Sequence, residues 1–360
     1  MTGAAAEAGA DGAQSGRLRT VAVVAAWFVL NTAMGSSTKW IFLYGKICNE
    51  SHGCHTYKFP LTITFIHMVF SWVMCFLHMH YVRGAKADLS FDQQLRKVAP
   101  LAACFALSVA SGNLSLKYLY PSFNQMLGSM APLITVVIAM VMQGKRFNAW
   151  TWISMPVICG GLSVCSVTEV NFHALGAFYA TSATVFRGMK SVIQGRLLSD
   201  TEKGMDSVAL LFYMSPWAAG LLLIVAVCLE GAQPLLLLAS GFNLGANVAG
   251  PLATQPSTGG ATVLVLLIVS GLNACLLNLA NFLVTSHTNA VTLQVLGNVK
   301  SCMSIAVSVA IFKNTLKPEQ ALGVLVCLFG VWLYQKKGGP AMPVKKNTVT
   351  PGHLGARPAS

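Results

Sequence analysis

Charged residues are scarce in this sequence, and acidic residues are the scarcest of them. Only 10% of the 360 residues are charged, with 11 Asp and Glu against 24 Lys and Arg, which gives a net charge of +13. A soluble domain usually carries about a quarter charged residues. Since 54% of the residues are hydrophobic and the mean hydropathy is +0.62, we do not expect a water-soluble globular fold.

Apolar runs of about 20 residues, each long enough to cross a bilayer, recur along the chain. We expect an all-α membrane protein with ten transmembrane helices. The predicted spans are 21–44, 59–80, 98–116, 122–143, 149–168, 174–196, 207–230, 261–284, 289–312 and 319–335. Residues 231–260, rich in Gly, Pro, Ala and Asn, are predicted to form an extramembrane loop, and residues 1–20 and 337–360 to be disordered tails.

The basic residues predict the orientation of the spans. An even number of spans places both termini on one side of the membrane. If that side is the cytosol, the cytosolic tails and loops contain 15 Lys and Arg, and the opposite face contains five. This asymmetry follows the positive-inside rule, so we expect both termini to be cytosolic. The excess of positive charge then needs no nucleic-acid partner.

A weak internal repeat is visible when the chain is shifted by 168 residues, because Asn113 then falls on Asn281 and Lys145 on Lys313. The two basic turns lie on opposite faces of the membrane, since five predicted spans separate them. We therefore predict two inverted five-helix repeats, residues 21–168 and 169–336. Many secondary transporters are built this way and bind substrate at the midplane between the repeats.

Four cations fall inside predicted spans: Lys39, Arg187, Lys190 and Lys300. A charge at the bilayer centre costs at least about 2.5–3.5 kcal/mol, so it is kept for a function. No Asp or Glu lies clearly within a span, so the counter-charge is expected to be an anionic ligand. Carriers coupled to protons or sodium usually use intramembrane carboxylates, and their absence favours exchange of one anion for another.

Each of these residues also has a structural interpretation. Lys39 is close enough to the end of its span to reach the interface, and one of Arg187 and Lys190 can face the headgroups. Lys300 is too deep for this. Amides in the spans either contact the substrate or join helices by hydrogen bonds. The candidates for substrate contact are Asn113, Gln194, Asn278 and Asn298, with Asn124, Gln125, Asn281 and Gln294 nearby.

The first loop on the non-cytosolic side contains Cys48, His52, Cys54 and His55. Their spacing matches no standard metal site, so we predict no metal and no cofactor, and a Cys48–Cys54 disulfide stays open. Asn49 begins a glycosylation sequon on the appropriate face, and its use stays open as well.

Five segments resemble the triose-phosphate translocator/nucleotide-sugar transporter family, which is solute carrier 35-like and belongs to the drug/metabolite transporter superfamily. These segments are Lys39–Phe42, Tyr57–Met68, Phe186–Gly195, Leu211–Pro216 and Thr292–Lys300. The resemblance runs from about residue 21 to residue 336. It implies a drug/metabolite transporter fold and anion antiport, with Lys300 and Arg187 binding phosphate oxygens and Lys190 and Lys39 assisting.

Two positions differ from the plastid members that this chain resembles. Those members have an Arg where this chain has Ser301, and a Lys at the position of Gly128. The resemblance therefore favours an antiporter that exchanges a nucleotide sugar for a nucleoside monophosphate across a Golgi or ER membrane. The alternative is an antiporter of an organic phosphate (triose phosphate or sugar phosphate) and inorganic phosphate, in a plastid-type membrane.

Two other classes of protein fit this sequence less well than a transporter. A membrane-embedded enzyme needs a base beside a nucleophile, a carboxylate or paired His, and the spans contain none of these arrangements. We therefore expect no enzymatic activity. A non-transporting scaffold differs from a transporter in binding no anion. The expected partners are the bilayer and a small phosphorylated anion, and the residues leave open whether the chain is a monomer or a homodimer.

Overall fold

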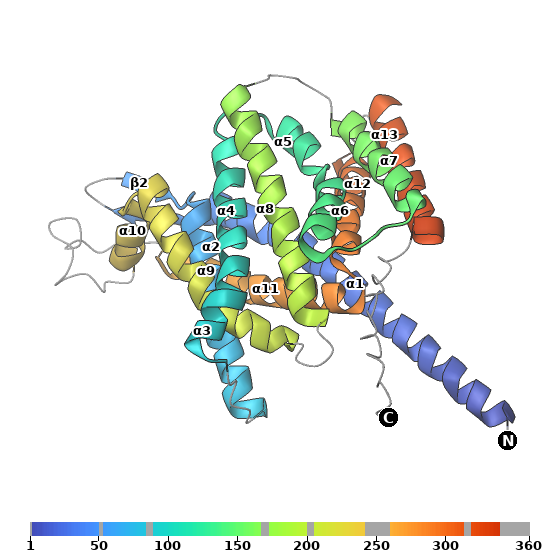
Figure 1. Cartoon of the computed structure of the whole chain (residues 1–360). Coiled ribbons are helices and arrows are strands. Elements are labelled where there is room, and N and C mark those ends of the chain that lie inside the picture. Colours follow the sequence, from blue (N-terminus) through green and yellow to red (C-terminus); the bar gives the residue numbers. More distant parts are fainter. Residues whose placement is uncertain are drawn as a thin grey trace, which may run out of the picture.

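The computed structural model describes residues 2–49, 53–83, 89–166, 173–199, 205–241, 260–312 and 318–338, and this part of the chain is almost entirely helical (Figure 1). The first half contains α1 (Thr2–Tyr44), β1 (Lys46–Asn49), β2 (Gly53–Thr56), α2 (Pro60–Leu77), η1 (His78–Arg83), α3 (Phe91–Gln93), η2 (Gln94–Val98), α4 (Ala99–Ser115), α5 (Pro121–Gly128), α6 (Ala131–Gln143) and α7 (Ala149–Ser166). The second half contains α8 (Ala174–Ser199), α9 (Ser207–Glu230), α10 (Gln233–Gly241), α11 (Gly260–His287), α12 (Ala290–Phe312), α13 (Pro318–Leu333) and η3 (Tyr334–Gly338).

A helix occupies each predicted span, and six helical segments of the described chain are long and apolar enough to cross a membrane. These segments are Gly16–Tyr44, Pro60–Val82, Phe91–Ser115, Phe123–Gln143, Ser207–Glu230 and Ala261–His287. Large apolar side chains such as Val141, Phe178 and Leu325 are exposed on the outside of the bundle, as expected where lipid replaces water. The all-α membrane class is therefore confirmed, and crossing by α7, α8, α12 and α13 stays a prediction.

Proline and glycine set several helix ends. Pro60, Pro121 and Pro318 begin α2, α5 and α13, where the missing N–H of proline costs nothing. Gly144, with φ of 62°, ends α6, and its N–H bonds to the carbonyl of Met140. A left-handed residue of this kind ends many helices.

The structure differs from the sequence-based expectations at three places. Helix α1 begins at Thr2, so residues 2–20, expected to be a disordered tail, are helical. The span 122–143 is divided into α5 and α6, because Pro132 lacks the N–H that would continue the helix. The loop 231–260 contains the short helix α10. Residues 242–259, 339–360 and Lys313 lie outside the described residues.

The hairpin β1–β2 follows α1 and places Cys48 opposite Cys54 in an antiparallel pair. The side chains of Cys48, Asn49, Cys54 and His55, and the whole of His52, lie outside the described residues. The disulfide and the use of the sequon therefore stay predictions.

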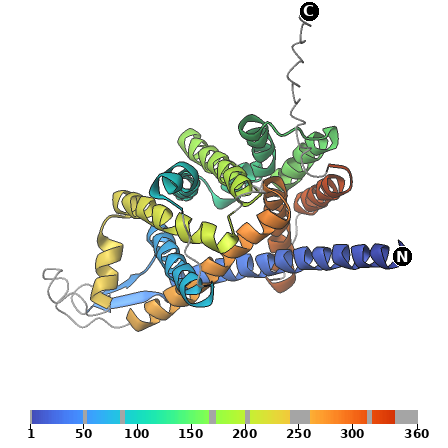
Figure 2. The same cartoon turned by 60° about the horizontal axis from the view of Figure 1, so that its bottom comes forward.

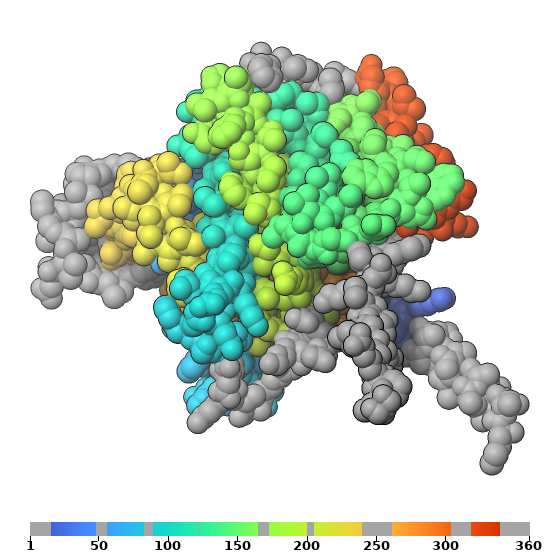
Figure 3. Space-filling model, in the orientation of Figure 1, coloured from blue at the N-terminus to red at the C-terminus, as the bar shows by residue number. Residues whose placement is uncertain are grey.

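The helices pack mainly in pairs: α2 with α9, α4 with α8, α1 with α11, and α7 with α13, while α6 contacts α8 and α12. Figure 2 shows α1 running alongside α11 across one end of the bundle. One apolar core joins α2, α4, α9 and α11, and a second joins α6, α7, α12 and α13. Helix α8 lies between α4 and α6 and contacts both (Figure 3).

Candidate anion-binding site

Helix α8 carries two of the predicted cations toward the interior of the bundle. Arg187 and Lys190 are one turn apart, and their face of the helix also carries the buried residues Ala183, Ser191 and Gln194. Arg187 belongs to this otherwise buried face, yet its own side chain is exposed. The guanidinium is therefore accessible to a dissolved anion.

Lys300 of α12 joins these two cations. Its side chain is half-buried, and the Nζ atom donates a hydrogen bond of 3.1 Å to Oδ1 of Asn31 on α1. The charge of Arg187 acts on both Lys190 and Lys300. We call Arg187, Lys190 and Lys300 the cation cluster. The cluster connects α8 and α12 of the second half of the chain with α1 of the first half, which contributes Asn31.

The partners of the two lysines are neutral. The Lys190 ammonium lies 4.7 Å from the ring centroid of Phe105 on α4, and Lys300 binds the Asn31 amide. Within the described part of the chain, no Asp or Glu pairs with any of the three cations; the ion pair found there, Arg96–Asp92, is exposed on η2 and α3. The cluster therefore keeps its positive charge, which a ligand anion would balance.

The break between α5 and α6 faces the cation cluster. A Cβ atom on Gly128 would lie 3.8 Å from Nη1 of Arg187, so this position opens toward the guanidinium. The neighbouring Ser129 is fixed on two sides: its carbonyl accepts a 2.9 Å hydrogen bond from Asn298, and its hydroxyl bonds to the carbonyls of Met126 (2.6 Å) and Cys159 (3.3 Å). The broken helix is thus held against both α12 and α7.

A second set of hydrogen bonds fixes α1. The Asn31 amide nitrogen donates to the Trp27 carbonyl at 2.8 Å, and Nε1 of Trp27 donates to Oδ1 of Asn281 at 2.6 Å. From α8, the Gln194 amide donates to the Asn281 carbonyl at 3.2 Å and to the Thr285 hydroxyl at 2.6 Å. Asn281 of α11 is therefore the point at which α1 and α8 are joined.

Only some of the predicted site residues lie together in the structure. It brings Arg187, Lys190 and Lys300 together. Gln194 and Asn298 are buried and join helices, which is the structural interpretation of these amides. The remaining candidates are placed as follows: Asn113 donates to Val109 of its own helix, Asn278 makes a long contact of 3.9 Å with Sδ of Met68, and Lys39 is exposed on α1.

Two residues of this region were not predicted from the sequence, Asn31 and Phe105. Asn31 had a detectable signal, because it is an amide inside an apolar span, and such residues are expensive to bury without a partner. Phe105 had none, since one aromatic residue in an apolar helix is indistinguishable from the rest of the core.

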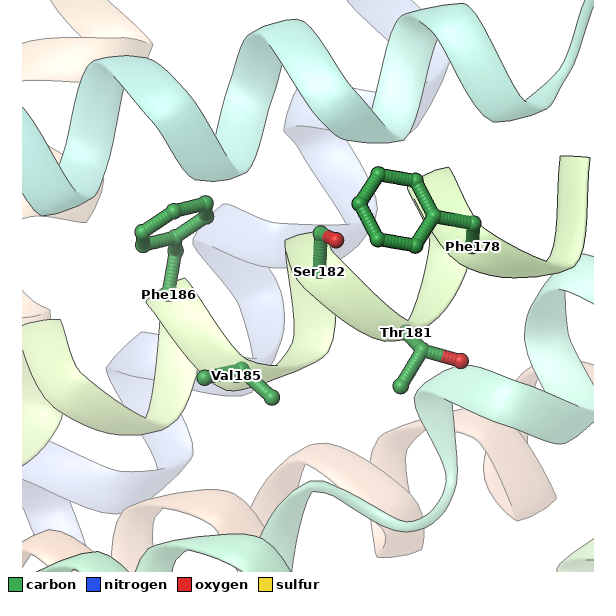
Figure 4. A pocket seen from close by; sticks show the side chains of 5 residues that line it. All are labelled: Phe178, Thr181, Ser182, Val185 and Phe186. Carbon is green, nitrogen blue, oxygen red and sulfur yellow. The ribbon is translucent and has the colours of Figure 1, made fainter. Parts of the chain in front are cut away.

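A shallow pocket on α8 lies away from the cation cluster. Phe178, Thr181, Ser182, Val185 and Phe186 line it (Figure 4). Their spacing of three or four residues places them on one face of the helix, centred opposite Arg187. Phe186, one helical turn before Lys190, is one of these residues and lines this largely apolar pocket.

Comparisons with known proteins cover almost the whole chain. The model of the Triose-phosphate Transporter family matches residues 18–335. A probable sugar phosphate/phosphate translocator of Arabidopsis thaliana is 34% identical over 90% of this chain and 97% of its own length. UDP-uronic acid transporter 1 of the same plant is also 34% identical, over 83% of this chain and 91% of its own.

More distant similarities agree with these. UDP-galactose transporter 1 of Arabidopsis thaliana is 29% identical over 88% of this chain and 86% of its own. One solved crystal structure, only 13% identical, superposes with a TM-score of 0.56 and covers 89% of this chain and 96% of that chain. At this identity the superposition supports the fold alone.

Proposed function

Because the chain belongs to the triose-phosphate transporter family, we propose that it is an antiporter that exchanges a nucleotide sugar for a nucleoside monophosphate across an endomembrane. Membership confirms the resemblance predicted from the sequence motifs. It also makes the chain an integral membrane protein of a family of transporters, not of enzymes. The substrate, the exchange of one anion for another and the binding site are what we propose here.

The observation that carries the proposal is the cation cluster, which has no acidic partner in the described chain. Three positive charges in a partly desolvated interior repel one another, and an anion between them relieves this repulsion. The diphosphate of a nucleotide sugar offers several oxygens, each able to accept charge-assisted hydrogen bonds from Arg and Lys. An anion exchanger also needs no carboxylate for coupling, which agrees with the lack of acidic residues in the spans.

The space at Gly128 supports a ligand larger than inorganic phosphate. No side chain at this position fills the region beside the Arg187 guanidinium, and Ser301 is turned to its own helix, where its hydroxyl bonds to the Gly297 carbonyl. In the plastid members that the sequence resembles, both positions carry cations. We assign phosphate binding to Arg187 and Lys300 with help from Lys190 and Lys39, and keep Asn113 and Asn278 as candidates for substrate contact.

The helix pairing supports two inverted five-helix repeats. In such a repeat, α4 is equivalent to α11 and α8 to α1, so the contact of α4 with α8 corresponds to the contact of α11 with α1. The pairs α2 with α9 and α7 with α13 each join equivalent helices. Ten membrane-spanning helices related in this way allow the two halves to rock around a site at their interface.

The location follows the same reasoning. Relatives include UDP-uronic acid transporter 1 and UDP-galactose transporter 1, and nucleotide sugars are made in the cytosol and used in the lumen. We place the chain in the Golgi or ER membrane with both termini cytosolic. The second candidate, exchange of an organic phosphate for inorganic phosphate, is favoured by the sugar phosphate/phosphate translocator among the relatives.

Counter-exchange in proteoliposomes tests the proposal. Vesicles loaded with UMP, GMP, CMP or inorganic phosphate are offered the matching labelled nucleotide sugars, or triose phosphate for the phosphate-loaded set. We expect uptake with one nucleoside monophosphate, and we expect Lys300→Ala to abolish it in a folded protein. Uptake driven only by phosphate would replace the first candidate with the second, and full transport by Lys300→Ala would refute the site.

A further inference from the structure

Two neutral side chains contact the lysines of the cation cluster, and nothing in the family resemblance assigns them a role. We propose that Asn31 and Phe105 are positioning residues, which hold the ammonium groups of Lys300 and Lys190 in place for a phosphate-bearing ligand without neutralising them. This inference rests on the anion-binding role proposed for the cluster.

Neutrality is the property that matters. A carboxylate beside Lys300 would hold the ammonium more strongly, but it would cancel the charge that attracts the ligand. The Asn31 oxygen occupies one of the three donors of the ammonium, which leaves two for phosphate oxygens. Over Phe105, the Lys190 ammonium contacts the ring face and keeps its full charge, since the attraction comes from the ring quadrupole.

The lysines need such partners because the cluster is electrostatically unfavourable when empty. The Arg187 charge acts on both Lys190 and Lys300, and lysine side chains are long and flexible. Without a partner, repulsion would turn each ammonium away from Arg187 and out of the site. Asn31 and Phe105 come from α1 and α4, helices that carry neither lysine, and their contacts hold the two ammonium groups where they are.

Both positioning residues are themselves held firmly. The Trp27 carbonyl can only accept a hydrogen bond, so the Asn31 nitrogen must face it and the Asn31 oxygen must face Lys300. Trp27 is in turn anchored to Asn281 on α11. Phe105 packs against the apolar core that joins α2, α4, α9 and α11. Each lysine is therefore tied to a part of the molecule that does not depend on ligand.

The test compares two substitutions of Asn31 that have nearly the same size. Asn31→Leu removes the hydrogen bond, so the ligand must itself order the Lys300 side chain, and we expect binding to weaken about 2- to 12-fold. Asn31→Asp keeps the contact and strengthens it, yet it pairs with Lys300 and lowers the charge of the cluster. We expect Asn31→Asp to weaken binding more than about 30-fold; it also loses the hydrogen bond to the Trp27 carbonyl, because an Asp oxygen cannot donate.

The measurement is ligand-induced thermal stabilisation of the purified full-length chain, titrated with UMP, GMP, CMP and inorganic phosphate. Asn273→Asp is the matched control, because Asn273 also joins α11 to α1, through the Leu30 carbonyl at 3.3 Å, but contacts no cation in the described chain. We expect its affinity to stay within about threefold of the wild type. Phe105→Leu should weaken binding about 2- to 30-fold and Phe105→Tyr should retain it.

The outcomes separate this inference from the proposed function. A purely structural role of Asn31 predicts the opposite order, with Leu, which makes neither hydrogen bond, worse than Asp, which keeps the contact with Lys300; that order, or an equal loss in Asn273→Asp, overturns the inference even if exchange is normal. If the wild type exchanges no nucleotide sugar but binds phosphate or a nucleoside monophosphate with the expected order of variants, the inference holds and the proposed substrate fails. Binding of none of these anions refutes both.

Discussion

Glu230 joins the end of one helix to the start of another, and its removal gives the sharpest stability prediction. Its carboxylate accepts hydrogen bonds from the backbone N–H of Leu61 (2.7 Å), the N–H of Thr62 (2.9 Å) and the Thr62 hydroxyl (2.7 Å). Phe59, the residue before α2, provides no side-chain cap. Glu230, the last residue of α9, therefore caps α2 across the bundle.

The expected cost follows from these contacts. A hydrogen bond to a charged group contributes about 1.5–3 kcal/mol, and the buried N–H groups of Leu61 and Thr62 would lose this contribution. Negative charge at a helix N-terminus adds about 0.3–1 kcal/mol. Because neighbouring contacts are not additive, we expect Glu230→Ala to lower the free energy of unfolding by about 3–5 kcal/mol. Glu230→Gln keeps one acceptor oxygen and should lower it by about 1–3 kcal/mol.

Equilibrium unfolding of the full-length chain in mixed micelles, titrated with denaturing detergent, measures these differences. Glu319 is the matched control, since it lies in the first turn of α13, as the Glu230 carboxylate lies at the start of α2, but it is exposed and belongs to the helix that it caps. We expect Glu319→Ala to change the free energy of unfolding by no more than about 1 kcal/mol. If Glu230→Ala also changes the free energy of unfolding by no more than about 1 kcal/mol, the carboxylate does not join α2 to α9 and the reasoning is wrong.

Two further predictions concern packing and a buried hydroxyl. Gly161→Ala should destabilise the chain by about 1–3 kcal/mol, because its Cβ would collide with the backbone of Cys327 on α13. Gly160→Ala is the control and should be neutral or stabilising, since a Cβ there meets nothing within 4 Å. Thermal unfolding compares the two variants, and equal effects would contradict the close approach of α7 and α13. Tyr57 lies before α2, where burial and the charge of Glu230 raise the pKa of its hydroxyl, and that hydroxyl has no hydrogen-bond partner in the described chain. Tyr57→Phe should therefore leave stability unchanged or raise it by up to about 2 kcal/mol, and a clear loss in the same unfolding assay would reveal a partner.

Much of the helical architecture was predictable from the sequence because the bilayer limits the alternatives. A backbone in lipid must satisfy its own hydrogen bonds, so each long apolar run becomes a helix. The predicted spans coincide with helices from α1 to α13, and the predicted starts at residues 59, 122 and 319 lie one residue from Pro60, Pro121 and Pro318, where α2, α5 and α13 begin. The break at Ser129 was missed, because Pro132 lies within an otherwise apolar run and its effect depends on the partners that accept the break.

The site was only partly predictable for a related reason. Lys300, Arg187 and Lys190 stood out because charge in a membrane is costly wherever it occurs. For Gln194 and Asn298, the sequence could not distinguish an amide that contacts substrate from one that joins helices. Only their hydrogen bonds to Thr285 and Ser129 show that they join helices. Lys39 shares the rarity of the other cations, but it is exposed on α1.

The sequence by itself determined the class of protein, its family and the excess of positive charge inside the bundle, because these depend on composition, local motifs and the cost of charge in lipid. Only the tertiary structure decided which helices bring the cations together and which neutral side chains hold them. Asn31 and Lys300 are 269 residues apart, and Phe105 and Lys190 meet only because α4 packs on α8. Contacts of this kind depend on how the helices pack, which no local pattern in the chain records.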